Sequence, residues 1–267
     1  MATQEKMLIV VNPAASQQPA VDRVENIARN SPFTELPEVT LLVAVDPSST
    51  DTRADNAAVY RDDEWLSTLK ARLADAKLSP QVRISWSREW ADAILYSAAQ
   101  ISAHSILVSH PGKSANKSFS DEFWYLVRNS PLPVSVVQSA RAPKGRPVVV
   151  SMDLQARELS DLNQRILEAG RVASQMYGGE LHLVNAYQDS MNYPDRGRLV
   201  ELTGIPNERI HLKAGEVYSV LHEVARELDP DMFIVGATRR TGIRAAMRGR
   251  KLGDILMTIE HDLLVIV

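Results

Sequence analysis

The sequence predicts an α/β protein built of two tandem units, each a five-stranded parallel sheet with helices on both faces. Short β-branched apolar segments alternate with segments whose apolar residues recur every three or four positions, which is the pattern of strands alternating with helices. The same order of elements occurs twice along the chain. Its 267 residues are also about twice the usual ~150 residues of one domain.

The first unit begins with a strand at Met7–Val11 and a helix at Ala20–Arg29, where Val21, Val24 and Ile27 recur at helical spacing. The elements that follow alternate in the same way: strand Val39–Val45, helix Glu64–Ala76, strand Gln81–Trp86, helix Ala91–Ser102, strand Ser105–Val108, helix Ser120–Val127 and strand Val134–Val137. The segment 140–147 combines prolines, a glycine and cations without a large apolar residue, which indicates a linker. We therefore expect domains at 1–140 and 141–267.

The second unit repeats the order of the first. Its predicted elements are strand Val148–Val150, helix Ser160–Met176, strand Glu180–Ala186, helix Asp195–Thr203, strand Arg209–Leu212, helix Val217–Leu228, strand Met232–Val235, helix Leu252–Ile259 and strand Leu263–Val267. Left alone, the last strand of each unit would be an exposed apolar sheet edge. We therefore expect the two units to pack as an intrachain pseudo-dimer.

Composition excludes several classes of protein. A net charge of −3 provides no general attraction for nucleic acid, and no apolar run approaches the ~20 residues that span a membrane. The absence of cysteine excludes disulfides, thiolate metal sites and cysteine nucleophiles. The six histidines have no metal-binding spacing, so we expect no metal. The first apolar run, Met7–Val11, is too short for a secretory signal, so we expect a cytoplasmic protein.

The strongest candidate site is the loop after the fourth strand of the second unit. Open parallel sheets bind ligands beyond the carboxyl ends of their strands. From Arg239 to Lys251 the loop holds six cations and no acid, and it leads into the helix Leu252–Ile259, whose N–H groups favour an anion. Three glycines would let the backbone approach a ligand: Gly236, Gly242 and Gly249. The pattern indicates a phosphate-bearing ligand, with Asp153 placed to contact a sugar or base. The alternative is a solvated loop and a helix-capping aspartate.

The segments Pro230–Gly236 and Asp262–Val267, with the glycine-spaced loop between them, resemble the carboxyl half of a universal stress protein domain. Nucleotide-binding members of that family carry Gly, two residues, Gly, nine residues, Gly, and then Ser or Thr. Gly236 and Gly249 match the first and third glycines, whereas Arg239 replaces the second glycine and Arg250 the hydroxyl residue. The resemblance implies a Rossmann-like fold for each unit.

The same resemblance implies further contacts. Asp153 matches the aspartate after the family's first strand, Val184 the strand that lines the adenine pocket, and Gly215 a glycine after the third strand. The candidate residues for a nucleotide or other anion are thus Asp153, Val184, Gly215, Gly236, Arg239, Gly249, Arg250 and Lys251. ATP or another adenine nucleotide is the candidate ligand. Because arginine brings charge but fills the space that phosphate needs, we expect weak binding.

The first unit lacks this loop. Its counterpart, Ser109–Gly112, keeps one glycine, and Glu122 stands where a phosphate would bind, so we expect no nucleotide there. The segment Ser120–Val134 resembles the amino half of tandem, E-type universal stress proteins. An aromatic set in this unit either lines an apolar cavity, forms a partner surface or belongs to the core: Trp86, Trp90, Phe119, Phe123, Trp124 and Tyr125.

The family resemblance implies a regulatory protein that aids survival under stress and is not an enzyme. No G-x-S-x-G motif occurs in the sequence, and neither candidate loop offers a positioned base or nucleophile. One alternative is a scaffold or apolar-ligand binder without a nucleotide site, and a third is a slow ATP hydrolase. A homodimer beyond the intrachain pseudo-dimer stays open.

Overall fold

The computed structural model describes residues 4–13, 15, 17–30, 32, 35–45, 63–110, 119–138, 143–152, 160–188, 193–237 and 252–267. The described residues up to 138 form one compact unit, unit 1, and those from 143 onward form a second, unit 2. Within each unit the strand pairs are parallel. The packing of one unit against the other, expected above as a pseudo-dimer, stays a prediction.

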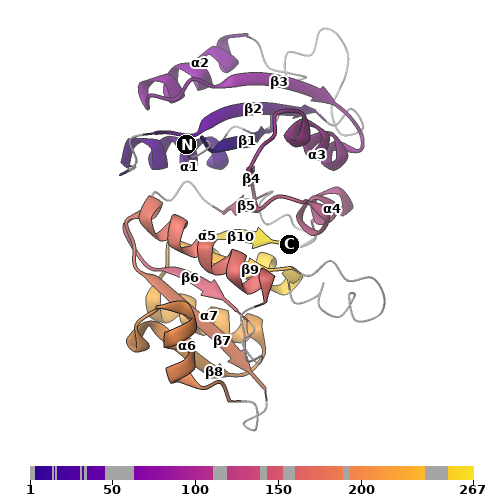
Figure 1. Ribbon diagram of the computed structural model, residues 1–267. Helices are drawn as coiled ribbons and strands as arrows, with labels where there is room; N and C mark the ends of the chain where they lie inside the picture. The colour runs from indigo at the N-terminus through magenta and orange to yellow at the C-terminus, as the bar shows by residue number, and fades with distance from the viewer. Residues whose placement is uncertain are drawn as a thin grey trace. The chain divides into compact units, whose positions relative to one another are not determined.

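The described residues of unit 1 form five strands and four helices. Figure 1 labels them. They are β1 (Lys6–Val11), α1 (Pro19–Asn30), β2 (Glu38–Val45), α2 (Asp63–Asp75), β3 (Gln81–Trp86), α3 (Trp90–Gln100), β4 (Ser105–Ser109), α4 (Asp121–Asn129) and β5 (Val134–Val137). All strand pairs of the unit are parallel, in the order β3-β2-β1-β4-β5. The strands β2 and β3 lie on one side of β1, and β4 and β5 lie on its other side. Open α/β sheets bind ligands at such a reversal of strand order, beyond the carboxyl ends of the strands.

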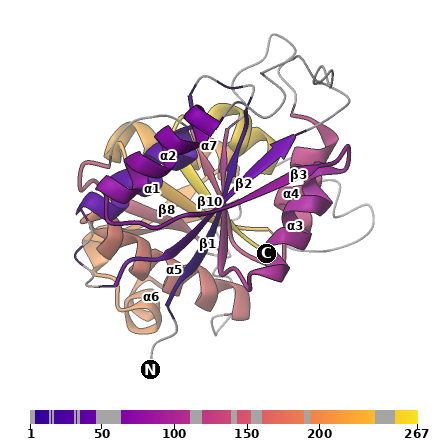
Figure 2. The ribbon, with the colours of Figure 1, turned by 90° about the horizontal axis from the view of Figure 1, so that it is seen from above.

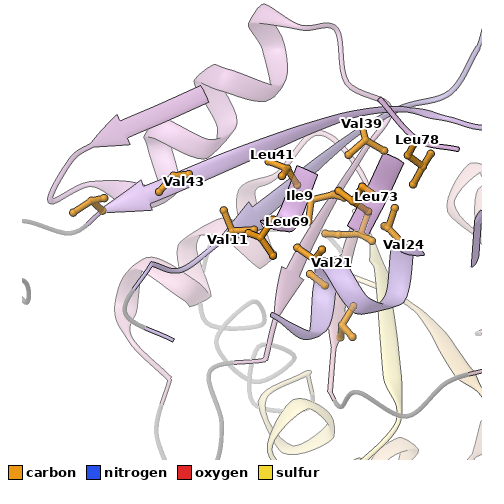
Figure 3. Close-up of a cluster of buried hydrophobic side chains, with 14 residues drawn as sticks. Ile9, Val11, Val21, Val24, Val39, Leu41, Val43, Leu69, Leu73 and Leu78 are labelled. Carbon is orange, nitrogen blue, oxygen red and sulfur yellow. The ribbon is translucent and has the colours of Figure 1, made fainter. Parts of the chain in front are cut away.

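The helices of unit 1 cover both faces of its sheet. Figure 2 shows α1 and α2 on one side of the strands and α3 and α4 on the other, as right-handed crossovers require for this strand order. The core under α1 and α2 is apolar and closely packed (Figure 3). It is formed by one face of β1 and β2 and the facing sides of the helices, including Ile9, Val11, Val21, Val24, Leu41, Val43, Leu69 and Leu73.

Unit 2 repeats this plan. Its elements are β6 (Val148–Ser151), α5 (Asp161–Tyr177), β7 (Leu181–Tyr187), α6 (Arg196–Thr203), a 3-10 turn at Asn207–Arg209, β8 (Ile210–Ala214), α7 (Val217–Leu228), β9 (Met232–Gly236), a helix at 252–258 and β10 (Asp262–Ile266). The strands are parallel in the order β8-β7-β6-β9-β10, the same order as in unit 1. Helix α5 lies across β6 and β9 (Figure 1). A Cβ on Gly170 would fall 2.5 Å from Val150, so glycine permits this close packing.

The predicted α/β fold with parallel strands and helices is confirmed, and within the described residues no predicted strand or helix end differs by more than two residues from the structure. The strand predicted from Arg209 begins instead at Ile210, because the N–H of Arg209 donates to the carbonyl of Pro206 and closes a 3-10 turn. Over the residues that the structure describes, no helix has the length and apolar character needed to cross a membrane.

Candidate functional site

Three of the eight candidate site residues, Val184, Gly215 and Gly236, lie in the described part of unit 2, at or near the carboxyl ends of its strands. The other five lie outside the described residues: Asp153, Arg239, Gly249, Arg250 and Lys251. The strand ends that border those segments are the described part of the candidate site.

The carboxyl end of β7 extends past its neighbour β6. Val184 is the last β7 residue in register with β6, opposite Ser151, and its carbonyl accepts a hydrogen bond from the N–H of Met152 at 3.1 Å. On the other side, β7 stays paired with β8 as far as Tyr187 opposite Ala214. The side chain of Val184 is buried. The last three residues of β7 thus form a step beyond the end of β6.

Asn185 stands on this step and was not among the predicted site residues. Its side chain is 1% exposed, and its Nδ2 donates to the carbonyl of Met152 at 2.8 Å. Within the described structure, its Oδ1 is buried and has no hydrogen-bond partner. The sequence does carry one signal for this residue, which is a single amide within the apolar end of a buried strand. Burying a polar group costs free energy unless it forms hydrogen bonds, so such a residue indicates a structural or functional role.

Gly215 makes the turn from β8 into α7. Its φ is +138°, a conformation that favours glycine, and its N–H donates to the carbonyl of Tyr187 at 2.9 Å. Helix α7 then begins at Val217, and the N-cap residue Glu216 makes no side-chain capping bond. The amide of Gln188 donates to the Glu216 carboxylate. The first turn of α7 thus presents main-chain N–H groups at the carboxyl end of β8.

Gly236 is the last residue of β9, where α5 approaches the sheet. An added Cβ would lie 2.9 Å from the side-chain ends of Ile166 and Leu162. Helix packing therefore gives glycine a structural role here, in addition to the close ligand approach that the sequence suggests. The following N–H, of Ala237, donates to the carbonyl of Ile266 at 2.7 Å.

Unit 1 fills the corresponding positions with its own side chains. Ser109 ends β4 as Gly236 ends β9, and its Oγ accepts a hydrogen bond from the N–H of Ala20 in the first turn of α1, at 3.1 Å. Glu122 accepts from the N–H of Ala91, in the first turn of α3, at 2.9 Å. Carboxylates and hydroxyls at helix N-termini satisfy the groups that would otherwise attract an anion. The acidic residue predicted to oppose phosphate thus caps a helix within its own unit.

The loop between β1 and α1 is closed in the same way. The buried side chain of Gln18 accepts from the N–H of Asn12 at 3.1 Å and donates to the carbonyls of Asn12 and Ala15. One amide thereby satisfies three main-chain groups of this loop.

Part of the aromatic set of unit 1 forms a closed cluster. Phe119 stacks on Phe123 with ring centroids 4.7 Å apart, and it meets the edge of Trp124 at 5.2 Å. Both phenylalanines are buried, and Arg128 lies 4.6 Å from the Trp124 ring. These contacts support the core interpretation for the phenylalanines. The ligand cavity expected as an alternative stays a prediction.

In the described parts of the chain, no three acidic or histidine side chains are grouped so that they could hold a metal ion. The closest approach of two histidines is between His182 and His211, whose Nδ1 and Nε2 are 3.0 Å apart. Two imidazoles alone do not complete the four-ligand set of a structural zinc site.

Comparison with curated proteins gives relatives that match this chain over nearly their full length. The chain is 23% identical over 298 residues to the Universal stress protein E homolog of Haemophilus influenzae, covering 97% of this chain and 96% of that protein. It is 24% identical over 303 residues to Universal stress protein E of Escherichia coli K12, covering 100% of this chain and 95% of the relative. No family model matches the sequence.

Solved structures share the fold over the whole chain. A universal stress protein of Archaeoglobus fulgidus has a TM-score of 0.76 at 14% identity, covering 97% of this chain and 95% of that one. A structure from Pseudomonas aeruginosa that is described as a universal stress protein has a TM-score of 0.78 at 20% identity, covering 99% of this chain and 93% of that one. Over nearly its full length the chain is therefore similar to universal stress proteins, in sequence to those of the E type and in fold to those of solved structure.

Proposed function

We propose that this protein is a non-catalytic regulator of stress survival that binds an adenine nucleotide weakly, in unit 2 only. The observation that carries the proposal is the contrast between the two sets of strand ends. Unit 1 satisfies the first turns of α1 and α3 with Ser109 and Glu122. In unit 2 the position of Ser109 is a glycine, Gly236. Helix α5, the counterpart of α1, is capped by Ser160, whereas α7, the counterpart of α3, begins without a side-chain capping bond.

The charge of the sequence supports an anionic ligand. The segment from Arg239 to Lys251 brings six cations to the chain between β9 and the helix at 252–258. Arginine at 239 and 250 supplies attraction without the small residues that let phosphate approach the backbone. The expected result is an affinity that depends mainly on charge and therefore falls as salt screens it.

A non-catalytic role is proposed because the described strand ends offer no activated nucleophile. Asn185, Gly215, Gly236 and the α7 first turn can bind and orient a ligand, but none of them can abstract a proton at neutral pH. A bound nucleotide would serve as a signal, and its effect would be transmitted by a change in the stability of unit 2.

Equilibrium dialysis of labelled ATP against the full chain, at low and at moderate salt, tests this proposal. We expect one ATP per chain at saturation, an affinity that falls with salt, and no release of phosphate above the uncatalysed rate. Two ATP per chain would contradict the restriction to unit 2. Phosphate release at several per second would contradict the non-catalytic role.

A second candidate function, a scaffold that works through its surface, is favoured by the edge strand β3. Ile84 is 50% exposed and Trp86 is 46% exposed on this strand, and exposed apolar side chains at a sheet edge are typical of contact surfaces. If dialysis detects no ATP at low salt, the scaffold becomes the better account.

A further inference from the structure

The outer edge of the unit 1 sheet carries an inference that does not depend on the nucleotide site. Strand β3 stands at the end of the strand order, and β2 is its one neighbour among the described strands. Figure 2 is seen from above Figure 1, so that β3 lies toward the viewer with α2 on one side and α3 on the other. Two large apolar side chains of this strand are about half exposed, Ile84 at 50% and Trp86 at 46%. An exposed apolar edge is a template on which a further strand can pair.

The main chain of β3 shows which residues can make that pairing. The N–H of Ser87 donates to the carbonyl of Val45 in β2 at 3.1 Å, so the main-chain groups at Ser87 face β2. These groups alternate in direction along a strand. Those of Val82 and Ile84 therefore point away from β2, toward the outer edge. The side chain of Val82 packs on the core under α1 and α2, and Ile84, two residues further on, lies on the same face of the sheet.

The outer edge of unit 2 is protected by a charged side chain. Strand β8 also stands at the end of the strand order, and Nη1 of Arg196 in α6 donates to the carbonyl of its first residue, Ile210, at 2.9 Å. The same nitrogen donates to the carbonyl of Asn207 at 3.0 Å. Charged side chains at an edge strand are one of the devices that keep it from pairing with another chain. Among the described residues, no side chain makes such a bond to Val82 or Ile84 of β3.

We propose that two copies of the chain pair through β3, antiparallel about a two-fold axis at Ile84. A two-fold contact brings the same strand of both copies together. Ile84 then lies opposite the partner's Ile84, where the two residues exchange main-chain hydrogen bonds. Val82 lies opposite the partner's Trp86, and Arg83 lies opposite the partner's Ser85. Apolar side chains thus meet on one face of the joined sheet, and no like charges stand directly opposite each other on the other face.

The neighbouring registers lack this match. A shift by two residues in one direction sets Arg83 opposite the partner's Arg83, and like charges directly opposite each other destabilise a strand pair. The same shift in the other direction sets Val82 opposite the partner's Arg88. A shift by one residue sets Ile84 opposite the partner's Arg83, which mixes the apolar and polar faces. Charge and apolar pattern therefore favour the register centred on Ile84.

Sedimentation equilibrium of the full chain tests whether the dimer exists. A contact of one strand pair is small, so we expect a weak dimer that forms at roughly micromolar concentrations. The Ile84→Lys variant sets two lysines opposite each other and should raise the dimer dissociation constant at least about tenfold. Val172→Lys on α5 is the matched control, because Val172 is an apolar residue of similar exposure, 45%. It should leave the dissociation constant unchanged.

The register is tested by cross-linking. The chain has no cysteine, so a single introduced cysteine can bond only to its copy in the partner. Opposite residues of such a pair have Cα atoms about 5.5 Å apart, within the range that a disulfide spans. With copper phenanthroline as the oxidant, Ile84→Cys should therefore form a covalent dimer in most of the protein. Arg83→Cys and the control Val172→Cys should form much less.

Three results would each overturn the proposal. The first is a wild-type chain that stays monomeric up to about 100 μM, a measurement that needs no variant to fold. The second is a dimer that Ile84→Lys leaves unchanged, because the contact would then lie elsewhere. The third is a covalent dimer that forms more readily with Arg83→Cys than with Ile84→Cys, because the axis would then lie at Arg83. No ATP is present in these experiments, so their outcome and that of the nucleotide proposal are independent.

Discussion

The imidazole rings of His182 and His211 lie parallel on the neighbouring strands β7 and β8, with Nδ1 of the first 3.0 Å from Nε2 of the second. Burial lowers the pKa of both histidines, and the nearby charge of His211 lowers that of His182 further. Five further charged groups also influence the pKa values of the two histidines: Glu180, Arg196, Arg209, Lys213 and Glu227. The folded pair is therefore favoured in its neutral form.

Acid should weaken unit 2 through this pair. An unfolded histidine has a pKa of about 6.5, so below that pH the unfolded chain binds more protons than the folded one. The contribution of the pair to stability is present above about pH 6.5 and is lost as the pH falls. Urea unfolding at pH 7.5 and pH 5.5 should show a smaller loss of stability for His211→Asn than for the wild-type protein. The control is His222→Asn in α7, and equal losses in all three proteins would contradict the role of the pair.

Glu122 should stabilise unit 1 as a cap supplied from another helix. Glu89, the N-cap residue of α3, makes no side-chain capping bond, whereas Glu122 accepts from the N–H of the buried Ala91. Glu122→Ala should therefore reduce the free energy of unfolding by about 1 kcal/mol. Glu122→Gln, which keeps an acceptor oxygen, should lose less. Asp121→Asn is the neighbouring control, and a Glu122→Ala protein as stable as the wild type would show that the cap contributes nothing.

Alanine substitution at two glycines of unit 2 should lower the free energy of unfolding by very different amounts. At Gly179 an added Cβ would lie 1.8 Å from the main-chain oxygen of Arg146, which cannot move without displacing the strand that follows. Gly179→Ala should lower the free energy of unfolding by roughly 3 kcal/mol or more. At Gly236 the neighbours are the mobile ends of Leu162 and Ile166, so Gly236→Ala should cost only about 1 kcal/mol. Thermal unfolding of both variants measures these losses of stability. Equal losses in Gly179→Ala and Gly236→Ala would contradict the prediction.

The fold is largely predictable from local sequence, because strands and helices here have clear apolar periodicity. The shifted start of β8 depends on a turn in which the N–H of Arg209 donates to the carbonyl of Pro206, and apolar periodicity does not show such a bond. Long-range partners are not predictable in this way. Glu122 lies 31 positions from Ala91 and Asn185 lies 33 positions from Met152, so their bonds appear only once the sheets have formed.

The candidate site is less predictable than the fold for a physical reason. Cations and glycines after a strand indicate an anion-binding site. They do not reveal whether the glycine is also needed for the close packing of a helix, as Gly236 is for the packing of α5. Asn185, the buried polar residue near the described strand ends, lies within the strand β7. The sequence pattern that predicted the site lies instead in the glycine-containing loop after β9.

The central claim is that unit 2 binds ATP through charge, with Arg239 and Arg250 limiting the space for phosphate. Calorimetric titration of ATP into the wild-type protein and into the double variant Arg239→Gly, Arg250→Ser, each at two salt concentrations, tests it most directly. We expect weak and salt-sensitive binding by the wild-type protein and tighter, less salt-dependent binding by the double variant, because glycine and serine give phosphate room and a compact donor. Tight binding by the wild-type protein, or weaker binding by the double variant, would contradict the claim and identify the two arginines as ligands of the phosphates.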